Sequence, residues 1–72
     1  MSQHAFQSNK IARDLCEQFG LEQCVVLGFS DARGYEVIAA GANETDAQIA
    51  TEVAIALKEG LDRTGEPVKL VV

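Results

Sequence analysis

Residue types that commonly carry catalysis, metal binding or disulfide bonds are scarce in this chain. Its 72 residues include one histidine and two cysteines. His4 lies near the start of the sequence, where side chains are usually solvated. Cys16 and Cys24 have neither C-x-x-C spacing nor enough companions for a disulfide framework or a metal site. We therefore expect no bound metal, and we expect both thiols to be small buried hydrophobic groups.

Motifs of enzymes and nucleotide-binding proteins are also absent. No serine stands in a G-x-S-x-G turn. The glycines at positions 28, 34 and 41 form neither G-x-G-x-x-G nor a phosphate-binding loop with a lysine. No nucleophile stands beside a base, and no carboxylate pair marks a pocket. We predict that the chain is not an enzyme and that it binds no cofactor.

Basic residues are few, which bears on nucleic-acid binding. Six lysines and arginines face eleven aspartates and glutamates, so the net charge is −5. Affinity for nucleic acid comes largely from basic side chains that neutralise phosphates, and here they are scattered among acids. We expect no direct nucleic-acid binding. The acidity leaves open a mimic of nucleic acid that blocks a DNA- or RNA-binding protein, although dispersed acids favour a role in solubility.

Long apolar runs are missing as well. No stretch is long enough to span a bilayer, and no basic, apolar and small-residue series marks a signal peptide. The expected location is therefore cytoplasmic. The length predicts a single domain over 1–72 that buries roughly 60% of the surface of its unfolded chain. Because much of the apolar content is alanine, we expect marginal stability as a monomer, which favours a homodimer or another protein partner.

The first segment has the spacing of an amphipathic helix. Its apolar residues recur about every four positions: Ile11, Ala12, Leu15, Cys16 and Phe19. Gly20 follows them, where a left-handed residue is favoured at a helix end. Ser2 would cap a long helix and Ser8 a shorter one.

Two strands and a turn come next. Residues 23–30 and 35–40 are rich in β-branched and aromatic side chains, and the turn between them ends in Gly34. A three-residue loop with Gly34 as a left-handed bulge predicts that Asp31 lies opposite Tyr35 and Phe29 opposite Val37. One face of this hairpin would then carry Val25, Leu27, Phe29, Tyr35, Val37 and Ala39.

A second helix and a last strand complete the chain. The helical stripe consists of Ala50, Val53, Ala54, Leu57 and Leu61. Asn43 or Thr45 is expected to cap this helix, and the segment 64–67 is expected to end it. Residues 68–72 read as the last strand. The chain is thus predicted to be an α+β protein of order α-β-β-α-β, with both helices on one face of a three-stranded, mainly antiparallel sheet. A crossover through the second helix would place the last strand beside the first, in the order 2-1-3.

The second face of the predicted hairpin is more apolar than a solvated face requires. It carries Cys24, Val26, Ile38 and Ala40, and only two polar residues accompany them. We interpret this face as part of a protein interface. The predicted interface residues are Phe6, Val26, Ile38, Ala40, Ile55 and Leu70. The alternative is that the N-terminal helix covers this face from the opposite side.

Two resemblances bear on function. The stretch from Val25 to Ile38, with its turn at 31–34 and the ending Glu36-Val37-Ile38-Ala39-Ala40-Gly41, resembles short uncharacterised phage and prophage proteins. The resemblance implies an accessory protein that binds and inhibits host machinery, although this sequence lacks the cysteine that those proteins often carry in the second helix. The element order also resembles the N-terminal half of roadblock/longin-like modules, which dimerise and scaffold the regulation of small GTPases.

Both resemblances imply a binding module and transfer no catalytic residue. We therefore expect a small non-enzymatic protein–protein interaction module, either a phage or prophage accessory protein that inhibits a host protein or a dimerisation scaffold of the roadblock kind. The acidic nucleic-acid mimic is the other alternative.

Overall fold

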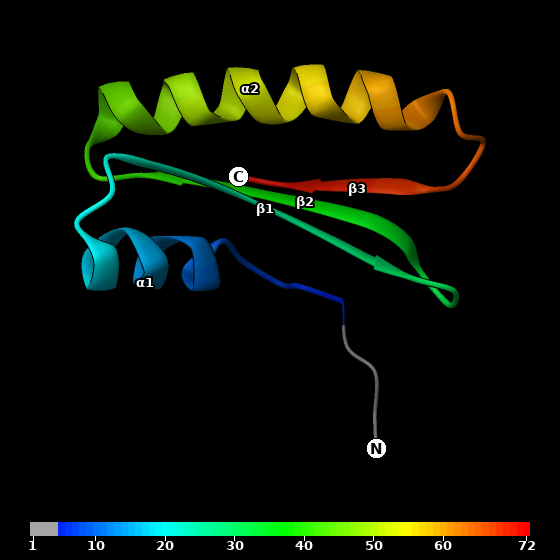
Figure 1. The fold of residues 1–72 in the computed structure, drawn as a ribbon, viewed down its shortest axis with the longest axis horizontal. Coiled ribbons are helices and arrows are strands. Elements are labelled where there is room, and N and C mark those ends of the chain that lie inside the picture. Colours follow the sequence, from blue (N-terminus) through cyan, green and yellow to red (C-terminus); the bar gives the residue numbers. More distant parts are fainter. Residues whose placement is uncertain (1–4) are drawn as a thin grey trace.

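The computed structural model describes residues 5–72, so Ser2 and His4 lie outside the described residues. Five elements follow one another along the chain (Figure 1). They are helix α1 (Lys10–Phe19), strands β1 (Gln23–Ser30) and β2 (Gly34–Gly41), helix α2 (Glu44–Asp62) and strand β3 (Val68–Val71). The α+β class, the element order and the three-stranded sheet agree with the prediction.

The ends of both helices are set by local side chains and by one glycine. Helix α1 is the shorter of the two alternatives, but its N-cap is Asn9, without a side-chain capping bond, and not Ser8; the Ser8 hydroxyl accepts a 3.3 Å hydrogen bond from the Lys10 amide. Gly20 ends the helix with a left-handed φ of 63°. At α2, the Asn43 side chain accepts a 2.8 Å bond from the Asp46 amide, so Asn43, not Thr45, is the cap.

The hairpin has a different register from the predicted one. Ser30 lies opposite Gly34 and Phe29 lies opposite Tyr35, so the predicted pairing of Asp31 with Tyr35 is wrong. Gly34 has the expected left-handed φ, 79°, but it pairs with Ser30 instead of standing outside the ladder as a bulge. The observed pairing differs from the predicted one by an even number of residues, and alternate residues of a strand point to opposite faces. The predicted division of side chains between the two faces therefore still holds.

Strand β3 lies beside β2, not beside β1, and the sheet order is β1-β2-β3. The predicted order 2-1-3 is therefore wrong, and the sheet is mixed because β3 runs parallel to β2. The connection after α2 returns to the start of β2, where the Tyr35 amide donates a 2.8 Å bond to the Pro67 carbonyl. A side chain at Gly34 would collide with Pro67, so this close approach requires glycine. This contact directs β3 to the free edge of β2.

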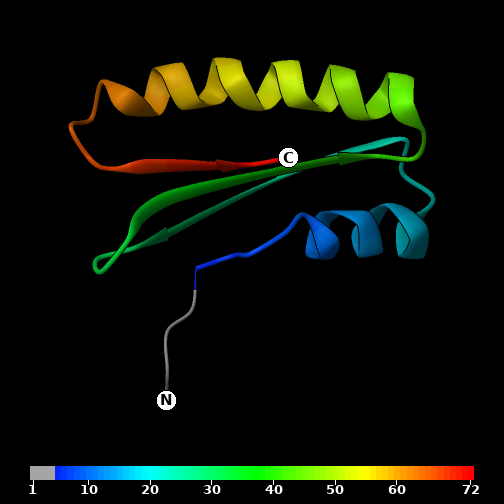
Figure 2. The same cartoon turned by 180° about the vertical axis from the view of Figure 1, so that it is seen from behind.

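The two helices cover opposite faces of the sheet, which corrects the prediction that both lie on one face (Figure 1 and Figure 2). Under α2, Val37 and Ala39 pack with Ala50 and Ala54. On the other face, Ile38, Ala40 and Val71 pack with Ala12 of α1. Because β2 is apolar on both faces, a single layer of helices would leave one of them in water.

The extended segment 5–9 continues the cover that α1 provides. Glu36, which is 3% exposed, accepts bonds from the Phe6 amide at 2.8 Å and from Arg33 Nε at 3.1 Å. Lys69 Nζ donates to the Phe6 carbonyl at 2.9 Å, and Asn9 Nδ2 donates to the Ala39 carbonyl at 3.1 Å. Burial by itself would raise the pKa of Glu36. The two hydrogen bonds and the charges of Arg33 and Lys69 outweigh it, and the pKa lies below its usual value.

Candidate protein interface

The face predicted to bind a partner is covered within the chain. Ile38 is 0% exposed and Ala40 is also buried, and both belong to the cluster that packs with α1. Phe6 and Val26 are half-buried against the same cluster. The prediction that this face forms an interface is therefore wrong for Ile38 and Ala40, and for Phe6 and Val26 it stays a prediction. Of the two alternatives, cover by the N-terminal helix is the one that the structure shows.

The remaining predicted interface residues, Leu70 and Ile55, lie apart from each other: Leu70 is under α2, and Ile55 is an exposed residue of α2 itself. Leu70 is half-buried in the cluster under α2, next to Val37 in the parallel register. Ile55 is exposed, and its position on the helix is about 100° from Ala54, on the side away from Val53. The structure does not bring these six residues together into one surface.

Sequence reasoning missed the edge strand β1, which carries the largest exposed apolar side chains of the sheet. Leu27 is 48% exposed and Phe29 is 52% exposed, and the Phe29 ring lies 4.8 Å from the Tyr35 ring. Both residues point to the α2 face, but α2 runs over β2, in the middle of the sheet, and leaves them uncovered. The signal was present in the sequence as a strand of eight residues with no charged side chain.

The free backbone groups of β1 can be assigned from the hydrogen bonds of β2. The Tyr35 amide points to Pro67, on the β3 side, so the pair Phe29 and Tyr35 exchanges no backbone bond. Bonded and non-bonded pairs alternate along an antiparallel ladder. The odd-numbered residues Val25, Leu27 and Phe29 therefore direct their N–H and C=O groups outward. The same residues carry their side chains on the α2 face.

Helix α2 contributes a second apolar stripe beside this strand. Ala50, Ala54, Leu57 and Leu61 pack on the sheet. The residue before each of these four is exposed, and together these preceding residues form a second stripe along the helix: Ile49, Val53, Ala56 and Gly60. Gln23 Nε2 of β1 donates a 2.9 Å bond to Asp46, which precedes this stripe on the same side of the helix. The stripe therefore flanks β1. We define the β1–α2 surface as the free edge of β1 with Leu27, Phe29, Ile49, Val53, Ala56 and Gly60.

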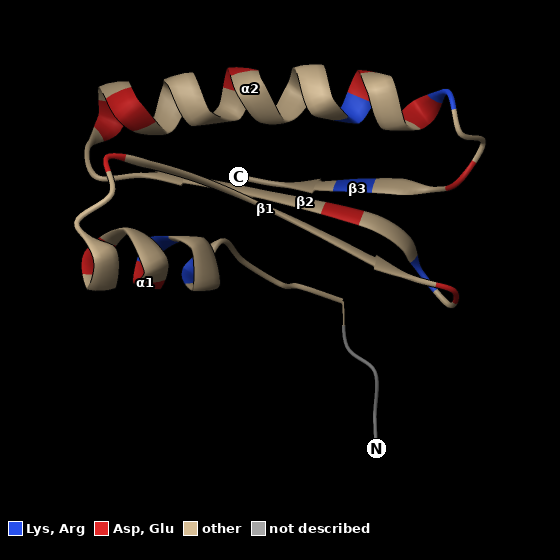
Figure 3. Ribbon diagram, in the orientation of Figure 1, with Lys and Arg blue, Asp and Glu red and all other residues tan. Residues whose placement is uncertain are grey.

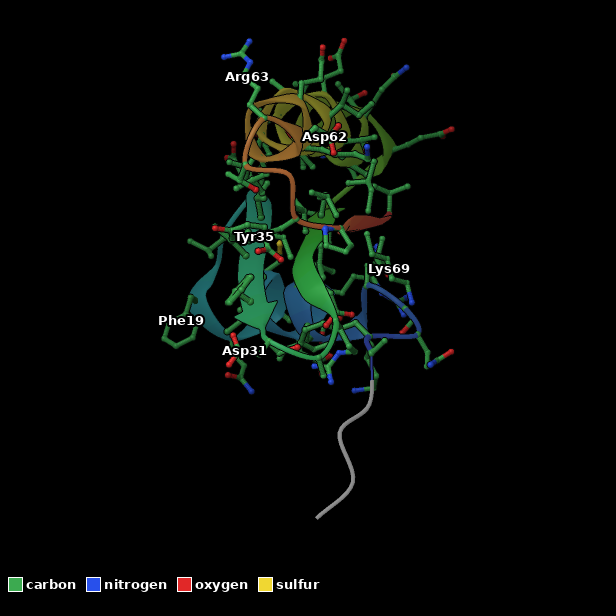
Figure 4. All side chains as sticks on the ribbon, turned by 90° about the vertical axis from the view of Figure 1, so that its right-hand side faces the viewer. Phe19, Asp31, Tyr35, Asp62, Arg63 and Lys69 are labelled. Carbon is green, nitrogen blue, oxygen red and sulfur yellow. The ribbon has the colours of Figure 1, made fainter. Side chains whose placement is uncertain are left out.

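None of the residues of the β1–α2 surface is charged, but Glu52 and Glu59 are exposed beside its α2 stripe, and further charges lie at its ends (Figure 3). Glu22 and Asp31 flank β1, and Asp46 and Arg63 begin and end the exposed stripe of α2. Figure 4 shows Arg63 on the β1 side of α2, and Phe19, which is 68% exposed, also projects on this side. The opposite edge differs, because β3 has only four residues and carries Lys69. Exposed apolar groups thus gather on the β1 side of the molecule.

The two thiols lie next to each other between α1 and β1. Cys16 is buried, and Cys24 is half-buried. Desolvation, and then the charge and hydrogen bond of the neighbouring Cys16, raise the pKa of the Cys24 thiol. A raised pKa leaves little of the nucleophilic thiolate at neutral pH. Cys16 is accordingly a buried core residue, as the sequence predicts, whereas Cys24 is only half-buried.

The described residues offer few other sites. A hollow of about 260 Å³ is lined by Arg13, Cys16, Glu17, Gly41 and Ala42, which is slightly below the usual range of small-molecule pockets, about 300–1,000 Å³. Within residues 5–72, no three histidine, cysteine, aspartate or glutamate side chains are grouped as metal ligands would be. Neither helix in the described range has the length and apolar character needed to cross a membrane.

Comparisons of the chain with protein-family models, with curated proteins and with solved structures find no match.

Proposed function

We propose that the chain is a non-enzymatic module that acts through protein–protein contact, and that the β1–α2 surface is its contact site. One observation carries this proposal: β1 is an eight-residue edge strand without a charge, a proline or a bulge. Edge strands that stay unpaired usually carry such features, since a bare edge recruits other strands. The exposed side chains beside this edge are apolar, which suits burial in an interface.

The two resemblances fit a module of this kind. A phage or prophage accessory protein that inhibits a host protein, or a dimerisation scaffold of the roadblock kind, would each need an apolar docking surface. The acidic residues are spread over α1, β2, α2 and the loops (Figure 3), so nucleic-acid mimicry gains no supporting observation.

The experiment is affinity capture with three forms of the chain as bait. Leu27→Lys places a charge in the β1–α2 surface, whereas Ile55→Lys places the same charge on the other side of α2 at a similarly exposed residue. We expect the wild type and Ile55→Lys to retain the same protein, and Leu27→Lys to lose it. Circular dichroism of each bait checks that the fold is intact. The proposal is wrong if no complex, including a complex of the chain with itself, is sensitive to Leu27→Lys.

A further inference from the structure

We propose that a second copy of this chain occupies the β1–α2 surface. The two β1 strands would lie side by side and antiparallel about a two-fold axis at Leu27, forming one six-stranded sheet. This inference rests on the proposed function, because it names the occupant of the same surface.

The backbone of β1 fits such a pairing. With the axis at Leu27, Val25 lies opposite the partner's Phe29, and Leu27 lies opposite the partner's Leu27. These are the odd-numbered residues whose N–H and C=O groups point outward, as the bond from Tyr35 to Pro67 establishes. Each of these pairs can therefore exchange two hydrogen bonds across the new edge. No hydrogen bond between β1 and β2 has to break.

The helices are spaced to leave room for the exposed side chains. Because α2 lies over β2, the two α2 helices would be three strand spacings apart, about 14 Å. Helices in direct contact are about 8–10 Å apart. The difference leaves a trough over the paired strands, and Leu27 and Phe29 of both copies point into it. Ile49 and Val53 of each copy form its walls.

The charges at the ends of the surface favour an antiparallel second copy. Helix α2 and strand β1 have nearly equal lengths, about 28 Å and 26 Å. A two-fold axis at the strand centre therefore brings the start of one α2 near the end of the other. Asp46 would approach the partner's Arg63, which lies on the β1 side of its helix (Figure 4). The dipoles of the two antiparallel helices also attract each other at these ends.

The polar ends of the strands are also compatible with this register. Asp31 lies opposite the partner's Gln23. Gln23 Nε2 donates one of its two hydrogens to Asp46 within its own chain and keeps the second for a further acceptor. The interface is small, since one strand and one helix flank form it. We therefore expect a weak, reversible dimer and not a permanent one.

Sedimentation equilibrium of the full chain from about 5 to 500 μM is the first test of this dimer. We expect a monomer–dimer equilibrium for the wild type, an unchanged equilibrium for Ile55→Lys, and at least tenfold weaker association for Leu27→Lys. A wild-type chain that stays monomeric over this range overturns the inference. So does a dimer that Ile55→Lys weakens and Leu27→Lys does not.

Amide hydrogen exchange of the wild type is the second test, and it needs no variant. The Leu27 amide points outward and the Gly28 amide points to β2, so Gly28 is the internal reference. Leu27 should become protected only as the protein concentration rises, whereas Gly28 should be protected throughout. A dimer in which Leu27 still exchanges freely uses another surface, which overturns the inference. The proposed function survives that result if a different protein binds in a manner sensitive to Leu27→Lys.

Discussion

Replacing Glu36 by glutamine tests the anchor between segment 5–9 and the sheet. The carboxylate is almost fully buried and accepts bonds from two separate donors, the Phe6 amide and Arg33 Nε, one on each oxygen. A glutamine side chain has one carbonyl oxygen, so its amide group would face one of these donors without a bond. The substitution also removes the charge that pairs with Arg33.

The expected loss in the free energy of unfolding is about 2–3 kcal/mol, the size of a lost charged hydrogen bond with an unpaired buried donor. A chain of this length is stable by only about 4–11 kcal/mol in total. The loss corresponds to a decrease in Tm of roughly 10–20 °C. Urea denaturation at neutral pH, followed by circular dichroism at a fixed protein concentration, measures this difference. Glu59→Gln, at an exposed site of α2, is the control and should change stability by less than about 0.5 kcal/mol.

The pH dependence of this difference is the sharper test. Because the pKa of Glu36 is lowered in the folded chain, its contribution to stability is present above the unfolded value of 4.5. It is lost as the pH falls through the folded pKa. The gap between wild type and Glu36→Gln should therefore shrink below pH 4.5. A gap that stays the same from neutral pH to well below this value would refute the assignment of Glu36 as an ionised anchor.

Two further predictions concern the cover of the sheet by α1. Ile38→Ala should cost about 2–4 kcal/mol because it leaves a cavity under α1; Ile55→Ala, at an exposed site, should cost much less, and equal losses in urea denaturation would contradict the buried position of Ile38. Cys24 should react with iodoacetamide more slowly than a free thiol at pH 8, since its pKa is raised, and the rate should increase above pH 9. Labelling at the rate of a free thiol would contradict this placement.

Local features of the fold were predictable because they depend on neighbouring residues. The helix ends at Gly20 and Asn43 and the strand at 23–30 follow from capping and β-propensity. The division of the hairpin residues between two faces depends only on the alternation of side chains along each strand. This division was therefore predicted correctly although the pairing of the two strands was not. The register itself depended on whether Gly34 pairs or stands outside the ladder, and the turn sequence allows both.

The long-range arrangement could not be deduced in the same way. The position of β3 beside β2 depends on the contact between Tyr35 and Pro67, which lie far apart in the sequence. Likewise, the apolar residues Val26, Ile38 and Ala40 show that a face needs cover, but not whether the cover comes from the same chain or from another. For this reason Ile38 and Ala40 were wrongly predicted as interface residues. The absence of charge from β1 is a different kind of signal, because it does not depend on knowing which helix covers which face.

The contacts between the helices and the sheet are made largely by methyl groups. Ala12, Ala50 and Ala54 meet Ala39, Ala40 and their neighbours at the two interfaces between layers. The neighbours of these buried alanines are close-packed, so a larger side chain in their place has no free space and would push the helix away from the strands. Larger side chains at these alanine positions are therefore expected to destabilise the fold. The surface offers more freedom for stabilising changes than this core, and Leu27 and Phe29 are among the exposed apolar residues that a further contact could bury.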